Sequence, residues 1–197
     1  ELVWCFFLPK HQQVEKYLAM IEEYLKENCR LLEKKLFEYR FRDAEEKEVV
    51  NALKLYQNQD GGFGQGLESD IRMPDSSPLT TSIGVRILKD FDSSKKSEMM
   101  MRKAIRYFEK TYDQDRQGWY ALSEVVNEYP HTPWWHYDQD KEMTVIDEHW
   151  GNPSAEIIAY LYKYSSYVNK LDVEDLVDNA IDYLNEKQNF ESENEVF

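Results

Sequence analysis

The sequence predicts an all-α protein built from repeated helical hairpins. Apolar residues recur at helical spacing along most of the 197 residues, Gly-aromatic corners separate the helices, and proline begins the helix that follows each corner. The chain has no long run of alternating β-branched residues bounded by turns, so a sheet is not expected. A single hairpin cannot bury both of its faces. We therefore expect the hairpins to stack, either as an open solenoid or as a closed ring of inner and outer helices.

Residues 1–44 are expected to form N-terminal helices within one domain that spans residues 1–197. After Pro9, apolar residues form one stripe with Glu and Lys on the other faces, and the pattern repeats from Asn28 to Phe41 before a loop begins. The residues of the first stripe are Val14, Leu18, Ile21 and Leu25.

Residues 45–91 form the clearest hairpin. The first helix carries an apolar side and runs into Gly61, Gly62 and Gly64, which bend the chain where a side chain would obstruct it. Pro78 begins the second helix, because its missing N–H costs nothing in a first helical turn.

Residues 98–164 repeat this design around a long inserted loop. The corner is now Gly118 and Trp119, and Pro153 begins the helix that matches the one at Pro78. Residues 172–197 are expected to start a further repeat, complete or truncated. The exposed end of such a stack could recruit a second subunit, so a homo-oligomer is compatible with the sequence.

The string Gln57-Asn-Gln-Asp-Gly-Gly-Phe-Gly64, which includes Asp60 and Phe63, resembles the Gln-to-aromatic repeat motif of the squalene–hopene cyclase and protein prenyltransferase superfamily. The resemblance implies a complete or partial α/α toroid. It also implies that Gln57 ties the corner to the start of the next inner helix and stacks on Phe63, where its amide can satisfy free N–H groups. The second corner departs from the motif, since Glu109 stands where the glutamine is expected.

A longer stretch, from about Asn28 to Tyr164, is similar to uncharacterised bacterial proteins of this superfamily. The segments that carry this likeness are Leu31-Leu-Glu, Phe37-Glu-Tyr39, Gly66-Leu-Glu-Ser-Asp-Ile-Arg72, Pro74-Asp-Ser-Ser-Pro78 and Tyr129-Pro-His-Thr-Pro-Trp-Trp135. The likeness implies a fold and brings no assigned reaction with it.

Composition limits the partners. The chain has 24 Lys and Arg against 38 Asp and Glu, a formal net charge of −14, which disfavours nucleic acid and anionic membranes as partners. Two cysteines, Cys5 and Cys29, are typical of a reducing, cytoplasmic compartment. The apolar run from Leu2 to Leu8 is too short for a membrane span and follows no basic stretch, so no signal peptide is expected.

The motifs of the superfamily's enzymes are absent from the sequence. Class II terpene cyclases protonate an alkene with an Asp-x-Asp-Asp motif, and the nearest runs here are Asp113-Gln-Asp115 and Asp138-Gln-Asp140. Protein prenyltransferases bind zinc through Asp, Cys and His, whereas both cysteines here precede the first clear repeat and the histidines have no ligand spacing. No metal and no cofactor are expected.

Two polar loops remain as candidate sites. The first lies between the Gly62 corner and Pro78, and the second lies between the Gly118 corner and Pro153. Both loops precede equivalent helices, so stacked repeats should place them side by side at one end, where a helical ring would bind a ligand. Their candidate residues are Glu68, Asp70, Arg72 and Asp75 in the first loop and His131, Trp134, Trp135, His136, Asp138 and Asp140 in the second.

Two functions follow from these loops. In one, Trp134, Trp135, His131, His136 and Arg72 bind a small molecule, an isoprenoid or a carbohydrate. In the other, an enzyme acting on a carbohydrate or an isoprenoid uses Asp70, Asp75 or Asp138 as acid and base. Two structural interpretations stay open beside them: the tryptophans can form a buried lid, and Arg72 can brace its loop against neighbouring acids.

Overall fold

The computed structural model describes residues 10–187. The chain divides into two compact units, Glu1–Leu53 and Lys54–Phe197, and the boundary falls inside the segment 45–91 that the sequence assigns to one hairpin. The expected all-α class is confirmed, since seven α-helices dominate the described residues and their one regular sheet has two short strands. Closure of the hairpins into a ring stays a prediction.

The first unit contains α1 (Lys10–Asn28), α2 (Leu31–Phe41) and most of α3 (Glu46–Lys54). The guanidinium of Arg42, just after α2, donates to Glu22 at 2.8 Å and to Glu15 at 3.2 Å, which ties this turn to α1. The stripe expected on α1 is present at helical spacing, but Val14 and Ile21 remain about half exposed. Cys29 is a free thiol, whereas Cys5 and the run from Leu2 to Leu8 lie outside the described residues.

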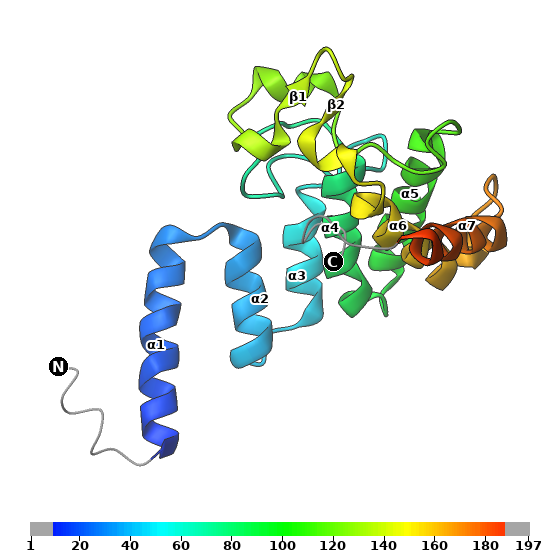
Figure 1. Cartoon of the computed structure of the whole chain (residues 1–197). Coiled ribbons are helices and arrows are strands. Elements are labelled where there is room, and N and C mark those ends of the chain that lie inside the picture. The colour runs from blue at the N-terminus through cyan, green and yellow to red at the C-terminus, as the bar shows by residue number, and fades with distance from the viewer. Residues whose placement is uncertain (1–9, 188–197) are drawn as a thin grey trace. The chain divides into compact units, whose positions relative to one another are not determined.

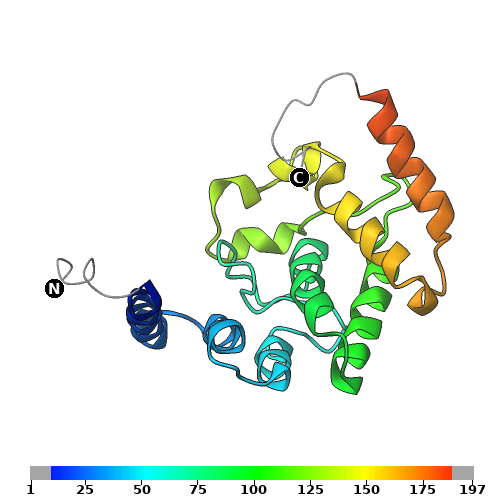
Figure 2. The ribbon, with the colours of Figure 1, turned by 90° about the horizontal axis from the view of Figure 1, so that it is seen from below.

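The second unit is organised around four helices (Figures 1 and 2). They are α4 (Pro78–Leu88), α5 (Lys95–Thr111), α6 (Gly151–Lys163) and α7 (Val173–Glu186). Helix α4 packs against both α5 and α6, and α6 packs in turn against α7. Repeated helices therefore lie side by side, as stacked hairpins require.

Short elements fill the connections of the second unit. The strands β1 (Tyr137–Asp138) and β2 (Met143–Thr144) form an antiparallel pair in which Tyr137 faces Thr144. The 3₁₀ helices are η2 (Lys89–Phe91), η3 (Glu124–Glu128), η4 (Pro133–Trp135), η5 (Val145–Glu148) and η6 (Ser165–Tyr167).

The helix expected at Pro78 begins there. Ser77 is its N-cap, and the Ser77 hydroxyl accepts a hydrogen bond from the Thr80 N–H at 3.0 Å. The start of α6 is less regular than expected, because Asn152 has non-helical φ and ψ angles immediately before Pro153. The helical turns of α6 thus continue from Pro153, which is the position that the sequence assigns to the helix start.

The first corner has the expected glycine geometry. Gly61 has a φ of +99°, and a Cβ there would lie 2.5 Å from the carbonyl oxygen of Lys103 in α5. Asp60 accepts hydrogen bonds from the Gly62 N–H at 3.0 Å and from the Ser76 hydroxyl at 2.9 Å. Asp60 thereby links the start of the first corner to Ser76, near the end of the loop that follows it.

Gln57 is buried, but its partners differ from those that the superfamily motif implies. Its amide nitrogen donates to the carbonyl oxygens of Gly61 at 3.0 Å and of Met100 at 2.9 Å. The expectation that it satisfies N–H groups at a helix start is therefore wrong, because Ser77 already caps α4. Gln57 instead joins the corner to the interior of α5.

The second corner repeats the first through its aromatic residue. The Phe63 N–H donates to the Thr81 hydroxyl of α4 at 2.9 Å, and the Trp119 N–H donates to the Ser154 hydroxyl of α6 at 3.0 Å. Both aromatic side chains are fully buried. The two corners are therefore equivalent in structure, and each is fastened to the helix that follows it.

The register of the second corner differs from that of the sequence alignment. The Asn58 N–H donates to the Gly62 carbonyl, and the matching bond in the second corner runs from the Asp113 N–H to Gly118. By this pattern Tyr112, not Glu109, occupies the position of Gln57, and the Tyr112 ring packs edge-on against Trp119 with 5.1 Å between centroids. The sequence alignment missed this because it pairs residues 51–56 with 103–108, whereas α5 runs three residues further before its corner begins.

None of the helices in the described part of the chain is long and apolar enough to cross a membrane.

Candidate functional site

The first corner loop (residues 64–77) and the second corner loop (residues 120–150) lie side by side, as the repeat predicts (Figure 1). The Arg72 N–H donates to the Pro130 carbonyl at 2.9 Å, and the Thr132 N–H donates to the Asp70 carbonyl at 3.2 Å. Ile71 and His131 form the bridge between them. Two segments about 60 residues apart along the chain thus share one end of the second unit.

The two tryptophans of the second corner loop have different environments. Trp135 is 9% exposed and belongs to a hydrophobic cluster that also contains Ile71, Met73 and Ile146. Trp134 is 47% exposed. The pair does not form one open platform: Trp135 packs as the buried-lid interpretation expects, and only Trp134 presents its ring to solvent.

His131 and His136 form a stacked pair with 5.5 Å between ring centroids. His131 Nδ1 lies 2.6 Å from the Tyr129 carbonyl oxygen and must donate to it, so in its neutral form His131 Nε2 accepts from His136 Nδ1 at 3.3 Å. The two rings therefore contact each other, and His131 also bonds to the backbone. Within the described residues, no group of three or more His, Cys, Asp or Glu side chains could hold a metal ion.

The carboxylates proposed as acid and base do not meet at an enclosed site. Asp70 and Asp75 are exposed, and Arg72 is exposed as well. Asp138 accepts hydrogen bonds from the backbone N–H groups of Asp140 at 2.9 Å and Lys141 at 3.3 Å, so it caps the turn between β1 and β2. None of these four side chains lines the cavity described next.

A cavity at this end of the second unit has a volume of about 720 Å³. It lies between the last residues of the first corner loop, the C-terminal end of α5 and the β1–β2 hairpin. Four tyrosines line it, and we call it the tyrosine pocket. These are Tyr107, Tyr112, Tyr120 and Tyr137.

Hydroxyl and charged groups complete the lining. Ser76, Ser77, Thr111 and Ser123 contribute hydroxyl-bearing side chains. The charged residues of the lining are Lys110, Asp113, Glu124, Lys141 and Glu142. The pocket therefore offers flat rings together with many donors and acceptors.

Three of the pocket tyrosines, Tyr107, Tyr112 and Tyr137, have a raised pKa. Burial raises the pKa of Tyr107 far above its usual value, and the negative charges of Asp60 and Asp75 raise it further. The pKa of Tyr112 is raised by burial and by Asp113, and that of Tyr137 by burial and then by Glu142 and Glu124. At neutral pH these hydroxyls are neutral groups that can donate hydrogen bonds to a ligand.

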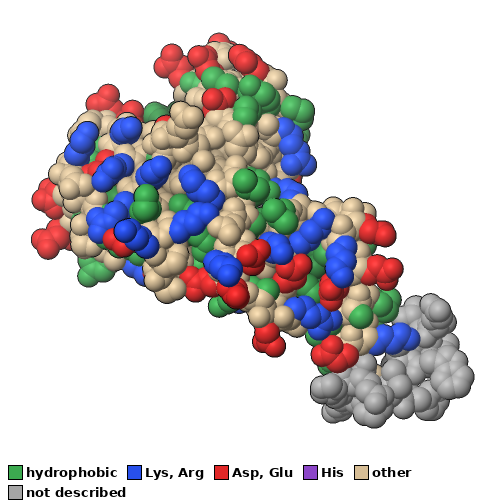
Figure 3. Space-filling view, turned by 180° about the vertical axis from the view of Figure 1, so that it is seen from behind, with side chains coloured by type: hydrophobic (Ala, Val, Ile, Leu, Met, Phe, Trp, Pro, Cys, Tyr) green, Lys and Arg blue, Asp and Glu red, His purple; other side chains and the backbone are tan. Residues whose placement is uncertain are grey.

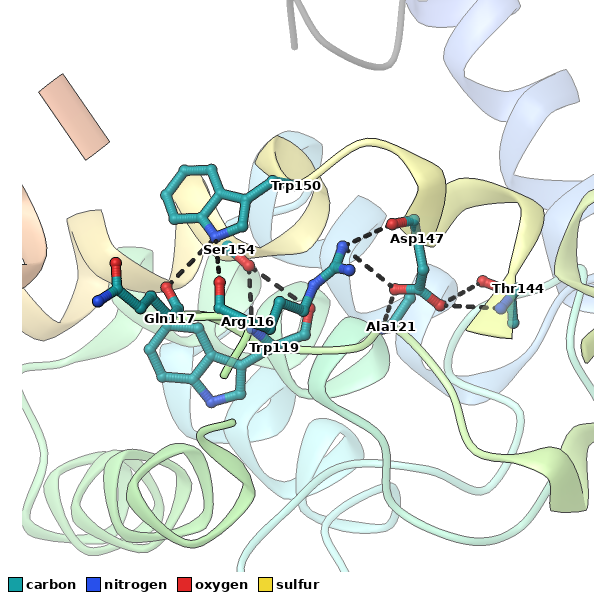
Figure 4. Close-up of polar contacts among 8 residues, drawn as sticks. All are labelled: Arg116, Gln117, Trp119, Ala121, Thr144, Asp147, Trp150 and Ser154. Carbon is teal, nitrogen blue, oxygen red and sulfur yellow. Dashed lines mark hydrogen bonds and ion pairs between the residues drawn. The ribbon is translucent and has the colours of Figure 1, made fainter. Parts of the chain in front are cut away.

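Buried Asp147 holds the walls of the pocket in place (Figure 4). One of its carboxylate oxygens accepts from the Ala121 N–H at 2.6 Å, and the other accepts from the Thr144 hydroxyl at 2.6 Å and the Thr144 N–H at 3.2 Å. Ala121 follows Tyr120, and Thr144 is the strand partner of Tyr137. Asp147 thus fixes the backbone beside two of the four pocket tyrosines.

Arg116 adds a second support for Tyr120. Its guanidinium donates to the Asp147 carbonyl oxygen at 2.7 Å, lies 4.0 Å from the Asp147 carboxylate, and sits 4.6 Å from the centroid of the Tyr120 ring. The Arg116 side chain is only 10% exposed, so this contact is shielded from solvent. One face of Tyr120 is therefore covered by a fixed cation.

The network around Asp147 also affects its own titration. Burial raises the pKa of the Asp147 carboxyl group, while the hydrogen bonds from Thr144 and Ala121 and the charge of Arg116 oppose that rise. Next along the chain, the Trp150 indole N–H donates to the carbonyls of Arg116 and Gln117, both at 3.2 Å (Figure 4). The segment from Arg116 to Ser154 is thus closed on itself by polar contacts.

The pocket tyrosines and Asp147 were not found from the sequence. Tyr112 and Tyr120 flank the Gly118–Trp119 corner at positions that the repeat alignment could have indicated if it had been anchored on the corner and not on the preceding helix. Asp147 lies in the inserted loop, which has no counterpart in the first hairpin and carries no motif. Its role depends on contacts with Ala121 and Thr144, which the hydrophobic periodicity of the sequence does not predict.

Comparisons with known proteins add no relative to this description, since no family model, no curated protein and no solved structure matches the chain.

Proposed function

We propose that this protein is a binding module that takes a small polyhydroxylated molecule, such as a sugar, in the tyrosine pocket. The observation that carries the proposal is the grouping of four tyrosines and several hydroxyl side chains around one cavity of about 720 Å³. The C–H faces of a sugar ring pack on aromatic rings, and its hydroxyl groups pair with tyrosine hydroxyls and carboxylates. The volume lies within the range of pockets that bind small molecules.

An isoprenoid fits this lining less well. Five charged side chains line the pocket, and a hydrocarbon chain would remove water from them without offering hydrogen bonds in return. The polar lining therefore favours the carbohydrate among the ligand classes that the sequence suggests.

The enzyme alternative has no support from the carboxylates named for it. Asp70 and Asp75 are exposed, Asp138 caps a turn, and none of them lines the tyrosine pocket. Of the pocket carboxylates, Asp113 already accepts a hydrogen bond from the Arg116 N–H at 2.7 Å. A general acid or base must reach the reacting atom, and Asp70, Asp75 and Asp138 do not reach this pocket. Glu124 and Glu142 line the pocket but are exposed, so we assign them to binding sugar hydroxyls.

The test is binding to an array of defined oligosaccharides, followed by calorimetry with the glycan that binds most tightly. Tyr120→Ala should weaken binding of that glycan about tenfold or more, since removing a stacking ring and its hydroxyl costs more than 1 kcal/mol. Tyr120→Phe keeps the ring and should lose only the contribution of one hydrogen bond, a factor of about 2 to 10.

The matched control is Tyr162→Ala. Tyr162 lies on α6, is 64% exposed and does not line the tyrosine pocket, so its removal should leave binding unchanged. Equal losses from Tyr120→Ala and Tyr162→Ala, or no binding to any glycan of the array, would contradict the proposal. Circular dichroism of each variant establishes that it is folded.

A further inference from the structure

Helix α5 is strongly basic in a chain that is otherwise acidic. Its sequence, KKSEMMMRKAIRYFEKT, holds six of the 24 Lys and Arg residues and only two acids. Figure 3 shows a group of Lys and Arg side chains on one face of the second unit. The net charge of −14 therefore conceals a local positive surface.

Four of these cations form a line along one side of α5. Lys96, Lys103, Arg106 and Lys110 are spaced by seven, three and four residues, which places them on one helical face, and all four are exposed. At 1.5 Å per residue the line is about 21 Å long. We call it the basic ridge.

The two acids of α5 do not neutralise the ridge. Glu98 pairs with Arg102 at 2.8 Å, and Glu109 accepts the backbone N–H of Asn169 at 2.6 Å. Beside the ridge, the pKa of Lys54 is lowered by burial and then by the charges of Lys103 and Lys96. Like charges therefore lie close enough to repel one another, as expected of a surface that meets an anion.

The basic ridge ends at the tyrosine pocket. Lys110 is both the last residue of the ridge and part of the pocket lining, and Lys141 from the β1–β2 hairpin lines the same cavity. The lining also holds three carboxylates, Asp113, Glu124 and Glu142, and Lys141 pairs with Glu148, so the positive surface is the ridge itself and begins at Lys110. A ligand that leaves the pocket at Lys110 can continue along α5 over this ridge.

We infer that the ligand is an anionic oligosaccharide, carrying carboxylate or sulfate groups, with one sugar ring in the tyrosine pocket and the following rings along the basic ridge. This inference rests on the proposed function of the pocket. Nucleic acid is the less favoured polyanion, because the net charge of −14 repels a long charged backbone outside the ridge.

The test compares hexagalacturonate with its fully methyl-esterified form, which has the same rings and linkages but no charge. We expect the acid to bind more tightly, and its affinity to fall when NaCl is raised from about 50 mM to about 500 mM. The double variant Lys103→Gln/Arg106→Gln should weaken binding of the acid about 3- to 30-fold and leave the ester unchanged. A heparin hexasaccharide tests sulfate in place of carboxylate.

The control is Lys163→Gln/Lys170→Gln, which removes two exposed charges from the same unit outside α5. It should leave the affinity for the acid unchanged. Equal binding of acid and ester, or equal losses from the two double variants, would overturn the anionic ligand while leaving a neutral sugar in the pocket possible. Tighter binding of a single-stranded oligonucleotide than of either anionic glycan would also overturn it. If neither the wild type nor Tyr120→Phe binds any glycan, charged or uncharged, the proposed function of the pocket is itself wrong.

Discussion

Gly84 and Phe63 show how one residue without a side chain allows a corner to close. Gly84 lies in α4, and a Cβ at this position would lie 2.5 Å from the Phe63 ring. The ring therefore occupies the space that any other residue would need, and it brings the first corner against α4. The requirement at Gly84 comes from this contact, since its backbone conformation is helical.

Gly84→Ala should destabilise the fold. The added methyl group overlaps a fully buried ring, and overpacking of this kind costs about 1 to 3 kcal/mol in the free energy of unfolding. Urea denaturation followed by circular dichroism measures the change. Gly151→Ala is the control, because a Cβ built there meets no atom of other parts of the chain within 4 Å, and its effect should stay within about 0.5 kcal/mol. A neutral Gly84→Ala would mean that the ring has room to move.

At the level of single residues, the sequence predicts the special positions better than their partners. Gly61, Pro78 and buried Phe63 are found from corner chemistry alone, because backbone rules act locally. The partner of Gln57 is not, since its bond to Met100 crosses 43 residues and depends on how α5 packs. Local rules cannot specify which carbonyl a buried amide will reach.

Among the elements, the two corner loops form the end of the second unit that carries the candidate site. Their adjacency could be predicted because equivalent loops of stacked hairpins must lie at the same end. The sequence could not predict which of the two tryptophans is buried. Adjacent residues of η4 point in different directions, and only packing decides which one faces the interior.

Trp135→Ala should destabilise the fold far more than Trp134→Ala. Trp135→Ala removes a ring from the cluster with Ile71, Met73 and Ile146 and should cost about 3 to 5 kcal/mol in the free energy of unfolding. Trp134→Ala removes a side chain that is 47% exposed and should cost less than about 1 kcal/mol. Thermal unfolding of both variants provides the comparison, and similar melting temperatures would contradict the assigned burial.

For the molecule as a whole, the inserted loop is the part that departs most from a simple repeat. It supplies the β1–β2 hairpin, the pocket wall at Tyr137 and the buried Asp147. The first hairpin has no such insertion, so the repeat predicts where the loop begins and ends and nothing of its interior. The fold class thus follows from periodicity, while the pocket depends on a segment without any.

Asp147 should make the stability of the protein depend on pH. Its pKa is raised above the ordinary value of 3.8, so its contribution to stability is fully present below that value and is lost as the pH rises through the higher folded-state pKa. Asp147→Asn removes this titration and leaves an N–H group facing the Thr144 N–H, at a cost of about 1 to 3 kcal/mol. The cost of Asp147→Asn should therefore be largest in acid and shrink toward neutral pH.

Urea denaturation of the wild type and the variant at a series of pH values tests this dependence. Asp115→Asn is the control, because Asp115 is exposed and its substitution removes the same charge. A pH-independent difference between the wild type and Asp147→Asn would show that Asp147 keeps one protonation state throughout.

The hydrogen bonds between the corner loops are made by backbone atoms: the carbonyls of Asp70 and Pro130 accept, and the N–H groups of Thr132 and Arg72 donate. Buried side chains such as Ile71 and Trp135 pack beneath them. Side chains that point outward from this seam contribute nothing to closing it. Substitutions of outward-facing side chains in the two corner loops therefore leave the backbone hydrogen bonds between the loops intact. The ligand specificity of this end can change in evolution without loss of the fold.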